Sequence, residues 1–463
     1  MKDRKFLQFL KKHSKKIIAA IVAIALLVSL TNIGVIAALF RKLSQKGKDP
    51  SASTKPSSAP TSPSATGSTS TLSREQELQL TLSQLSTEIE KFPDNPELYI
   101  KRAAVYYNLG QTDHAIQDYT SALEREDAPQ THYLRAVVYT SLGNNTDAYT
   151  DLTAALAGKP DNRDYLSLMA DTCNALKKYD ESLVCIEKLL ATGEGTCVLF
   201  ALAADACVYL EKHENAAIYY EKAISTYDTA AEKSGINKAS LYSAYGNSLK
   251  SIDRFADSAE AYSNALQLSD SKEYYFQRGF CLLQSEKYAD AISDFTRCIE
   301  LDYEKASAHF QRGLCYYATG KYPEAIEDFK VYEAASPDKT DSFLYMGLCY
   351  QNQKDYDSAI GYYDKCITAD ISKGICYFNL GNCYYNQKNY TEAVTKYTEA
   401  IALDSYKYES LLNRGLCYIQ LNKYNEAKVD LKLVIDECKD ESLVKSATES
   451  YEPIKNITII TKK

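Results

Sequence analysis

The sequence lacks the residue patterns of the common catalytic and metal sites. Tryptophan is absent, methionine occurs three times, and none of the five histidines belongs to an HxxxH or HExxH arrangement. Thirteen cysteines are present, but the number is odd and no CxxC pair occurs. No glycine-rich phosphate loop or nucleophile elbow is found. We therefore expect no catalytic residues, no metal, no cofactor and no enzymatic activity.

One long apolar run lies near the N-terminus. Residues 17–40 are 24 uncharged residues flanked on both sides by lysine or arginine. As a helix, this run is about 36 Å long and exceeds a hydrocarbon core of about 30 Å, so it predicts a single transmembrane helix after a basic segment, residues 1–16. Seven Lys/Arg precede it and five follow, which favours a cytoplasmic N-terminus and an extracytoplasmic body. A cleaved signal peptide is the alternative.

The next segment, residues 41–73, has few apolar side chains to bury. Its last 25 residues include 14 Ser/Thr and four Pro, which predicts a disordered, flexible linker. Residues 1–72 contain 12 Lys/Arg and two Asp, so the rest of the chain holds 41 Lys/Arg against 59 Asp/Glu. An acidic body repels phosphate backbones, and we expect it to bind no nucleic acid.

A 34-residue repeat organises the rest of the chain. FQRGFCLLQSEKYADAISDF, residues 276–295, has a near copy at 310–329. Ten such registers each carry Gly or Ala at one slot, a second small residue 12 positions later and a large residue four positions after that. Small residues let two helices approach, and large ones fill the space beside them. The slot residues are Ala103, Ala136, Ala170, Ala204, Gly246, Gly279, Gly313, Gly347, Gly381 and Gly415.

This pattern resembles the tetratricopeptide repeat, and residues 306–339 carry its marks at His309, Gly313, Tyr316, Ala325, Phe329 and Pro337. The resemblance covers about 96–441. It implies an all-α fold, a right-handed superhelical α-solenoid of about ten antiparallel helix pairs. Single repeats would not be stable, because each buries its apolar face against its neighbours.

The repeats also define the expected domain boundaries. The fourth and fifth slots are 42 residues apart, which predicts a lengthened helix, a loop near Gly235 and a bend or subdomain boundary. After the basic segment, the transmembrane helix and the linker, we expect a capping helix in 74–95, repeats one to four with the insertion in 96–238, repeats five to ten in 239–441, and a C-terminal cap and tail in 442–463.

Five of the cysteines share one repeated slot, two residues after the glycine: Cys281, Cys315, Cys349, Cys383 and Cys417. Stacked helices lie roughly 8 to 10 Å apart, whereas a disulfide needs Cα atoms within about 7 Å. We interpret these cysteines as small buried packing residues. A redox or metal role is the alternative.

Arginine and aspartate occur together in half of the repeats. Where an arginine precedes the slot, an aspartate follows 16 positions later, and the other five repeats have neither. This coincidence predicts an ion pair between the two helices of a repeat. The pairs are Arg102 with Asp118, Arg135 with Asp151, Arg278 with Asp294, Arg312 with Asp328, and Arg414 with Asp430. Arginines lining a binding surface are the alternative.

The first helices of the family line a concave face. Slots three before, one after and four after the glycine share a stripe on such a helix. In repeats six to ten the apolar members are Phe276, Phe280, Leu283, Phe310, Leu314, Tyr317, Leu344, Leu348, Phe378, Tyr385, Leu412, Leu416 and Ile419. They predict a groove for a partner protein or peptide. The alternative is that superhelical winding buries the stripe. The lysine and asparagine clamp that some family members use for a carboxylate is absent.

Together these features predict a single-pass membrane protein of the bacterial cell envelope, whose outward-facing body is a non-catalytic scaffold for a partner polypeptide. Two alternatives are an extracytoplasmic solute- or glycan-binding protein and a structural assembly element that oligomerises through the ends of its stack. The oligomeric state is not predicted.

Overall fold

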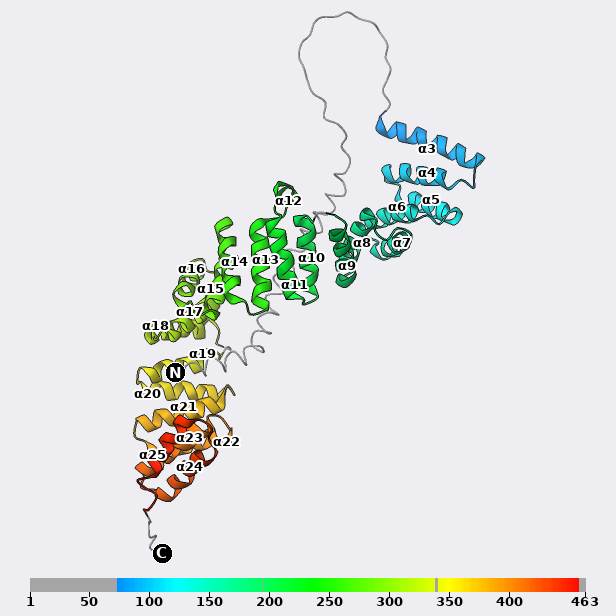
Figure 1. Cartoon of the computed structure of the whole chain (residues 1–463). Coiled ribbons are helices and arrows are strands. Elements are labelled where there is room, and N and C mark those ends of the chain that lie inside the picture. Colours follow the sequence, from blue (N-terminus) through cyan, green and yellow to red (C-terminus); the bar gives the residue numbers. More distant parts are fainter. Residues whose placement is uncertain (1–72, 194, 338–339, 458–463) are drawn as a thin grey trace, which may run out of the picture. The chain divides into compact units, whose positions relative to one another are not determined.

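The structure is a computed structural model that describes residues 73–193, 195–337 and 340–457. Within these ranges the regular elements are α-helices, which follow one another as antiparallel neighbours along the chain (Figure 1). The predicted basic segment 1–16, the transmembrane helix 17–40 and the linker up to residue 72 lie outside the described residues. Over the part of the chain that is described, no helix combines the length and the apolar character needed to cross a bilayer.

The helices divide between two compact units, one ending at Ser248 and the other beginning at Leu249, within α13. The predicted boundary, between 238 and 239, lies at the start of the same helix. The first unit contains α3 (Arg74–Lys91), α4 (Pro96–Asn108), α5 (Thr112–Arg125), α6 (Pro129–Ser141), α7 (Asn145–Gly158), α8 (Arg163–Ala175), α9 (Tyr179–Ala191), α10 (Cys197–Tyr209), α11 (His213–Ser225), α12 (Thr229–Lys233) and most of α13 (Lys238–Ser251).

The second unit continues from the end of α13. It contains α14 (Phe255–Leu268), α15 (Lys272–Gln284), α16 (Tyr288–Glu300), α17 (Lys305–Ala318), α18 (Tyr322–Ala335), α19 (Ser342–Asn352), α20 (Tyr356–Thr368), α21 (Lys373–Asn386), α22 (Tyr390–Ala402), α23 (Lys407–Gln420), α24 (Tyr424–Glu437) and α25 (Glu441–Tyr451). We call the first and second helices of each repeat helix A and helix B. The ten repeats begin with α4 and end with α24, and every A helix contains the small-residue slot.

Helices A and B approach closely at that slot. A Cβ atom added at Gly313 would lie 2.7 Å from the ring of Phe329, and one at Gly381 would lie 2.5 Å from the ring of Tyr397. Both rings are fully buried. The small-large pairing read from the sequence is therefore the contact that joins the two helices of a repeat.

The turn between helices A and B has the same backbone conformation in all ten repeats. The residue seven positions after the slot has a positive φ: glycine at Gly110, Gly143 and Gly320, and other residues at Lys177, Glu211, Asp253, Glu286, Lys354, Lys388 and Asn422. This left-handed residue ends helix A and favours glycine, which has no Cβ to clash. Seven repeats therefore hold a side chain in a conformation that costs free energy.

We expect Lys354→Gly to raise the free energy of unfolding by about 0.5–1 kcal/mol, because Lys354 is exposed and has a φ of 64°. Gly320→Ala is the matched reverse change, since Gly320 has a φ of 76° and no atom within 4 Å of an added Cβ. It should lower the same quantity by about 1 kcal/mol. Urea denaturation measures both, and changes of equal sign would contradict the explanation.

The insertion between repeats four and five differs from the prediction. No helix is lengthened: α11 has 13 residues, as α9 does. The additional residues instead form the separate helix α12, whose first turn is capped by Asp228, which accepts a 2.8 Å hydrogen bond from the amide of Ala231. Gly235, with a φ of 84°, lies in the loop that follows. The expected loop is thus present, but an N-cap starts a new helix where continuation was predicted.

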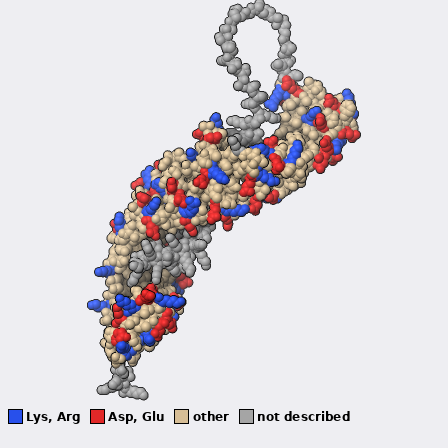
Figure 2. Space-filling model, in the orientation of Figure 1, with Lys and Arg blue, Asp and Glu red and all other residues tan. Residues whose placement is uncertain are grey.

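Both ends of the repeat array are covered by additional helices. Helix α3 begins at a capping box formed by Ser73 and Gln76, so Ser73 belongs to this helix cap, although it was placed in the linker. Its buried residues Leu85 and Ile89 pack with Leu98 of α4. At the other end, Ala447 of α25 packs against the core of repeat ten. On the face drawn in Figure 2, acidic and basic side chains are interspersed.

Candidate functional site

The predicted stripe on the A helices of the second unit is only partly accessible. Leu344 and Leu412 are buried, the other eleven predicted residues are partly buried, and none is fully exposed. The stripe is therefore not an open apolar groove. Leu344 and Leu412 have lost nearly all of their exposure to solvent, and the other residues keep part of theirs.

Aromatic contacts hold the stripe residues in place. The ring of Phe310 lies 5.8 Å from that of Phe329 and 4.8 Å from that of Tyr332, measured between centroids. Phe378 stacks on Tyr406 at 4.8 Å. A surface made of rings that already pack on the core loses little conformational entropy when a ligand binds. Phe310 and Phe378 of the stripe are thus packed on neighbouring rings before any partner binds.

Polar positions on the A helices are paired with tyrosine hydroxyls from helix B. Tyr363 donates a 2.6 Å hydrogen bond to Gln351 Oε1, and Tyr397 donates one of 2.8 Å to Asn382 Oδ1. In repeats six and seven the same stripe slots are apolar and phenylalanine, Phe295 or Phe329, replaces the tyrosine. In repeats eight and nine, helix B therefore supplies a hydroxyl to a polar group of helix A.

The five predicted Arg–Asp pairs all form, and each joins the two helices of one repeat. In every pair Nε and Nη2 of the arginine donate to the two carboxylate oxygens over 2.7 or 2.8 Å. The aspartates are buried, and about a fifth of the surface of each arginine side chain is exposed to solvent. These bonds raise the pKa of each arginine above its ordinary value. The arginines face the helix seam and not a binding surface.

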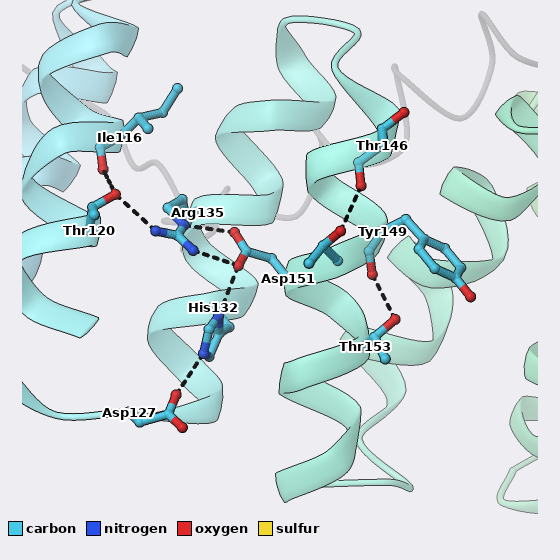
Figure 3. A network of polar contacts seen from close by, with 10 residues as sticks. Ile116, Thr120, Asp127, His132, Arg135, Thr146, Tyr149, Asp151 and Thr153 are labelled. Carbon is cyan, nitrogen blue, oxygen red and sulfur yellow. Dashed lines mark hydrogen bonds and ion pairs between the residues drawn. The ribbon is translucent and has the colours of Figure 1, made fainter. Parts of the chain in front are cut away.

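Each arginine also reaches the preceding helix B. Figure 3 shows this for Arg135, whose Nη1 donates to Thr120 Oγ1 on α5 over 2.8 Å. Arg312 binds Thr296 on α16 in the same way, and Arg102 binds Ser86 on α3. The arginine thus ties three helices, and α3 takes the place of a helix B. Sequence reasoning missed these hydroxyls, although a Ser or Thr 15 or 16 residues before each arginine was the available signal.

Two histidines extend these networks, and sequence reasoning missed their contacts too. Nδ1 of His132 lies 2.9 Å from Asp151 Oδ1, and its Nε2 lies 2.7 Å from Asp127 (Figure 3). His309 lies 2.7 Å from Asp328 Oδ1. Both stand three residues before the arginine, so one helical turn brings them beside it. No group of three or more His, Cys, Asp or Glu within the described ranges could hold a metal.

The five cysteines of the repeated slot are buried and free, in agreement with a packing role. Burial is the main cause that raises the pKa of the thiols of Cys349 and Cys383 to about 12, so they are protonated at neutral pH. They add no reactive group to the A helices.

Models of the tetratricopeptide repeat match residues 100–163, 199–228, 281–340, 341–369, 374–406 and 408–440. These segments cover more than half of the chain. The chain belongs to the tetratricopeptide repeat family. In this family a leucine often precedes the slot. In five repeats of this chain, the arginine described above stands at that position instead.

Solved structures of other tetratricopeptide repeat proteins are similar at low identity. Yeast Tom70 is 16% identical, with 79% of this chain and 96% of that chain covered and a TM-score of 0.34. YrrB, described as having an unusual peptide-binding site, is 20% identical over 40% of this chain and 93% of its own, at 0.35. A repeat protein from Parabacteroides merdae is 19% identical over 52% and 92%, at 0.31. No curated protein matches the sequence significantly.

Proposed function

We propose that this tetratricopeptide repeat protein is a non-catalytic scaffold that binds a partner polypeptide on its A-helix face. The observation that carries the proposal is the partly accessible stripe of the second unit. Its side chains are fixed by the core on one side, and eleven of them remain partly open to solvent on the other. Such a surface suits an amphipathic helix or an extended segment with aromatic anchors.

We further propose that residues 17–40 tether the scaffold to a membrane and that the body lies outside the cytoplasm of a bacterial cell. The supports are the uncharged run and the larger number of Lys/Arg before it than after it. In this arrangement the linker 41–73 holds the body away from the bilayer.

Proximity labelling from the full-length chain in intact cells tests both proposals. We expect extracytoplasmic neighbours, and we expect Leu348→Gln with Leu416→Gln to abolish labelling of the specific partner, because these residues lie on the accessible stripe. Val429→Gln is the matched control, since Val429 is a 68% exposed apolar residue on helix B of repeat ten. Equal labelling by both variants would contradict the docking site, and cytoplasmic neighbours alone would contradict the orientation.

A further inference from the structure

Two partly buried aspartates of the first unit lack the cation that the five buried aspartates of the helix seams have. Asp171 on α8 and Asp205 on α10 each follow the small-residue slot directly. Among the described residues, no lysine, arginine or histidine forms an ion pair with either one. Asp171 makes no side-chain hydrogen bond, and Asp205 accepts one, from the hydroxyl of Tyr220. By contrast, the five aspartates at the helix seams each receive two bonds from an arginine.

Both aspartates are partly covered by surrounding protein atoms. Each residue keeps partial exposure to solvent, yet protein atoms surround it. Desolvation by these atoms raises the pKa of Asp171 to about 7, with no contribution from a charged neighbour. Desolvation also raises the pKa of Asp205 to about 6, against the opposing effect of the Tyr220 hydrogen bond. A group that is both accessible and desolvated is placed to meet a ligand.

The two residues occupy equivalent positions in consecutive repeats. They are 34 residues apart, and α8 and α10 both pack against α9. Equivalent positions of stacked repeats line the same face of a solenoid. Ser167 and Asn174 lie four residues before and three after Asp171, on the same stripe of α8. On α8 this part of the face is therefore polar and acidic, whereas the corresponding neighbours of Asp205 on α10 are Ala201 and Val208.

We propose that Asp171 and Asp205 bind lysine or arginine side chains of a partner polypeptide. The inference rests on the proposed scaffold function and names the chemistry of its ligand. In the five Arg–Asp pairs at the helix seams, an arginine of the protein itself supplies the positive charge beside the aspartate. For Asp171 and Asp205, an ammonium or guanidinium group of the partner supplies it. Charge-assisted hydrogen bonds are strongest where the carboxylate is already desolvated. An acidic or purely apolar segment would leave these carboxylates unpaired.

Desolvation of these carboxylates, which raises their pKa values, opposes folding when they are charged. A carboxyl group whose pKa is higher in the folded than in the unfolded chain binds its proton more tightly when folded. The free energy of unfolding therefore falls as the pH rises from about 4 to about 7, and it stays at the lower value above that range. Asp171→Asn removes this loss, so the variant should unfold at the same or a higher temperature at pH 8. A group that weakens the fold without a partner is a candidate for function.

The test measures binding of fluorescein-labelled octalysine to the full-length chain at pH 8 by fluorescence anisotropy. Asp171→Asn with Asp205→Asn should raise Kd at least 10-fold without lowering the unfolding temperature. Glu214→Gln with Glu221→Gln removes the same charge from exposed positions of α11 and should change Kd less than 2-fold. Octalysine acetylated on every Nζ should not bind.

Equal losses in the two double variants, or equal binding of the acetylated peptide, would overturn the inference. The outcome is separable from that of the proposed function. If labelling depends on Leu348 and Leu416 but Asp171 and Asp205 have no effect on octalysine, only this inference fails. If octalysine binding depends on the aspartates but Leu348→Gln with Leu416→Gln leaves labelling of the partner unchanged, only the docking site in the second unit is contradicted.

Discussion

Asp328→Ala is expected to lower the free energy of unfolding by about 3–5 kcal/mol. The buried carboxylate accepts two hydrogen bonds from Arg312 and lies within hydrogen-bond distance of His309. Its removal leaves a guanidinium at a helix seam without its counter-charge, and this loss exceeds the net contribution of the intact pair. Equilibrium denaturation of Arg312→Ala, Asp328→Ala and the double variant gives the coupling energy. A coupling indistinguishable from zero would contradict the role of the pair.

Repeat eight provides a control for this prediction, because Met346 and Tyr362 stand where other repeats have the arginine and aspartate. Replacing Arg278 and Asp294 together by Met and Tyr removes both charges and supplies apolar volume. We expect a change within about 1 kcal/mol of zero, since apolar replacement of a whole buried pair is often neutral or stabilising. Asp294→Ala alone should be much more damaging. If the double replacement cost as much as the single one, the damage would not come from the unpaired charge.

Gly347→Ala is expected to destabilise the chain by about 1–3 kcal/mol. An added Cβ would lie 2.5 Å from Cε1 of Tyr363, whose ring is fully buried and whose hydroxyl is bonded to Gln351. The ring cannot move without breaking that bond, so the helices must separate. Repeat four has Ala204 at the slot and Tyr220 16 positions later, so it combines an alanine with a tyrosine at these two positions. The decrease in the free energy of unfolding of Gly347→Ala measures how far repeat eight can adjust toward that arrangement.

Gly361→Ala in the same repeat is the matched control. Gly361 lies in the interior of α20 with no atom within 4 Å of an added Cβ. Alanine should raise the free energy of unfolding there by up to about 1 kcal/mol, because its helix propensity exceeds that of glycine. Thermal denaturation of the two variants should give shifts of opposite sign. A stabilised Gly347→Ala variant would contradict the close approach of α19 and α20.

The sequence predicted the features that depend on spacing within a repeat. A small residue followed 16 positions later by a large one identifies the contact between helices A and B, and the shared occurrence of arginine and aspartate identified their pairing. Contacts between successive repeats were harder to predict from the sequence. Thr296 and Thr120 bind arginines of the following repeat, but Ser and Thr are common on helix surfaces and carry no signal by themselves.

Accessibility was the property that the sequence could not give. Leu344 and Leu412 share the spacing of the other stripe residues but are buried, because the exposure of a side chain depends on the helices packed around it and not on its spacing alone. The same applies to Asp171, which reads as an ordinary polar residue on an exposed face. Its desolvation depends on the packing of the helices and could be seen only after the helices were placed. The insertion was misread for another reason, since Asp228 starts a new helix instead of extending α11.

The arginines that tie three helices also bear on how the chain comes apart. They stand in repeats one and two of the first unit and in repeats six, seven and ten of the second, so the remaining repeats lack this tie of three helices. In repeats four and eight, Tyr219 and Tyr362 replace the aspartate, and each donates one hydrogen bond to a glutamate of the preceding helix B. In a linear array each repeat depends on the next, and local opening begins where neighbour contacts are weakest. Amide protons of repeats three, four, eight and nine should therefore exchange with solvent before those of repeats two and seven.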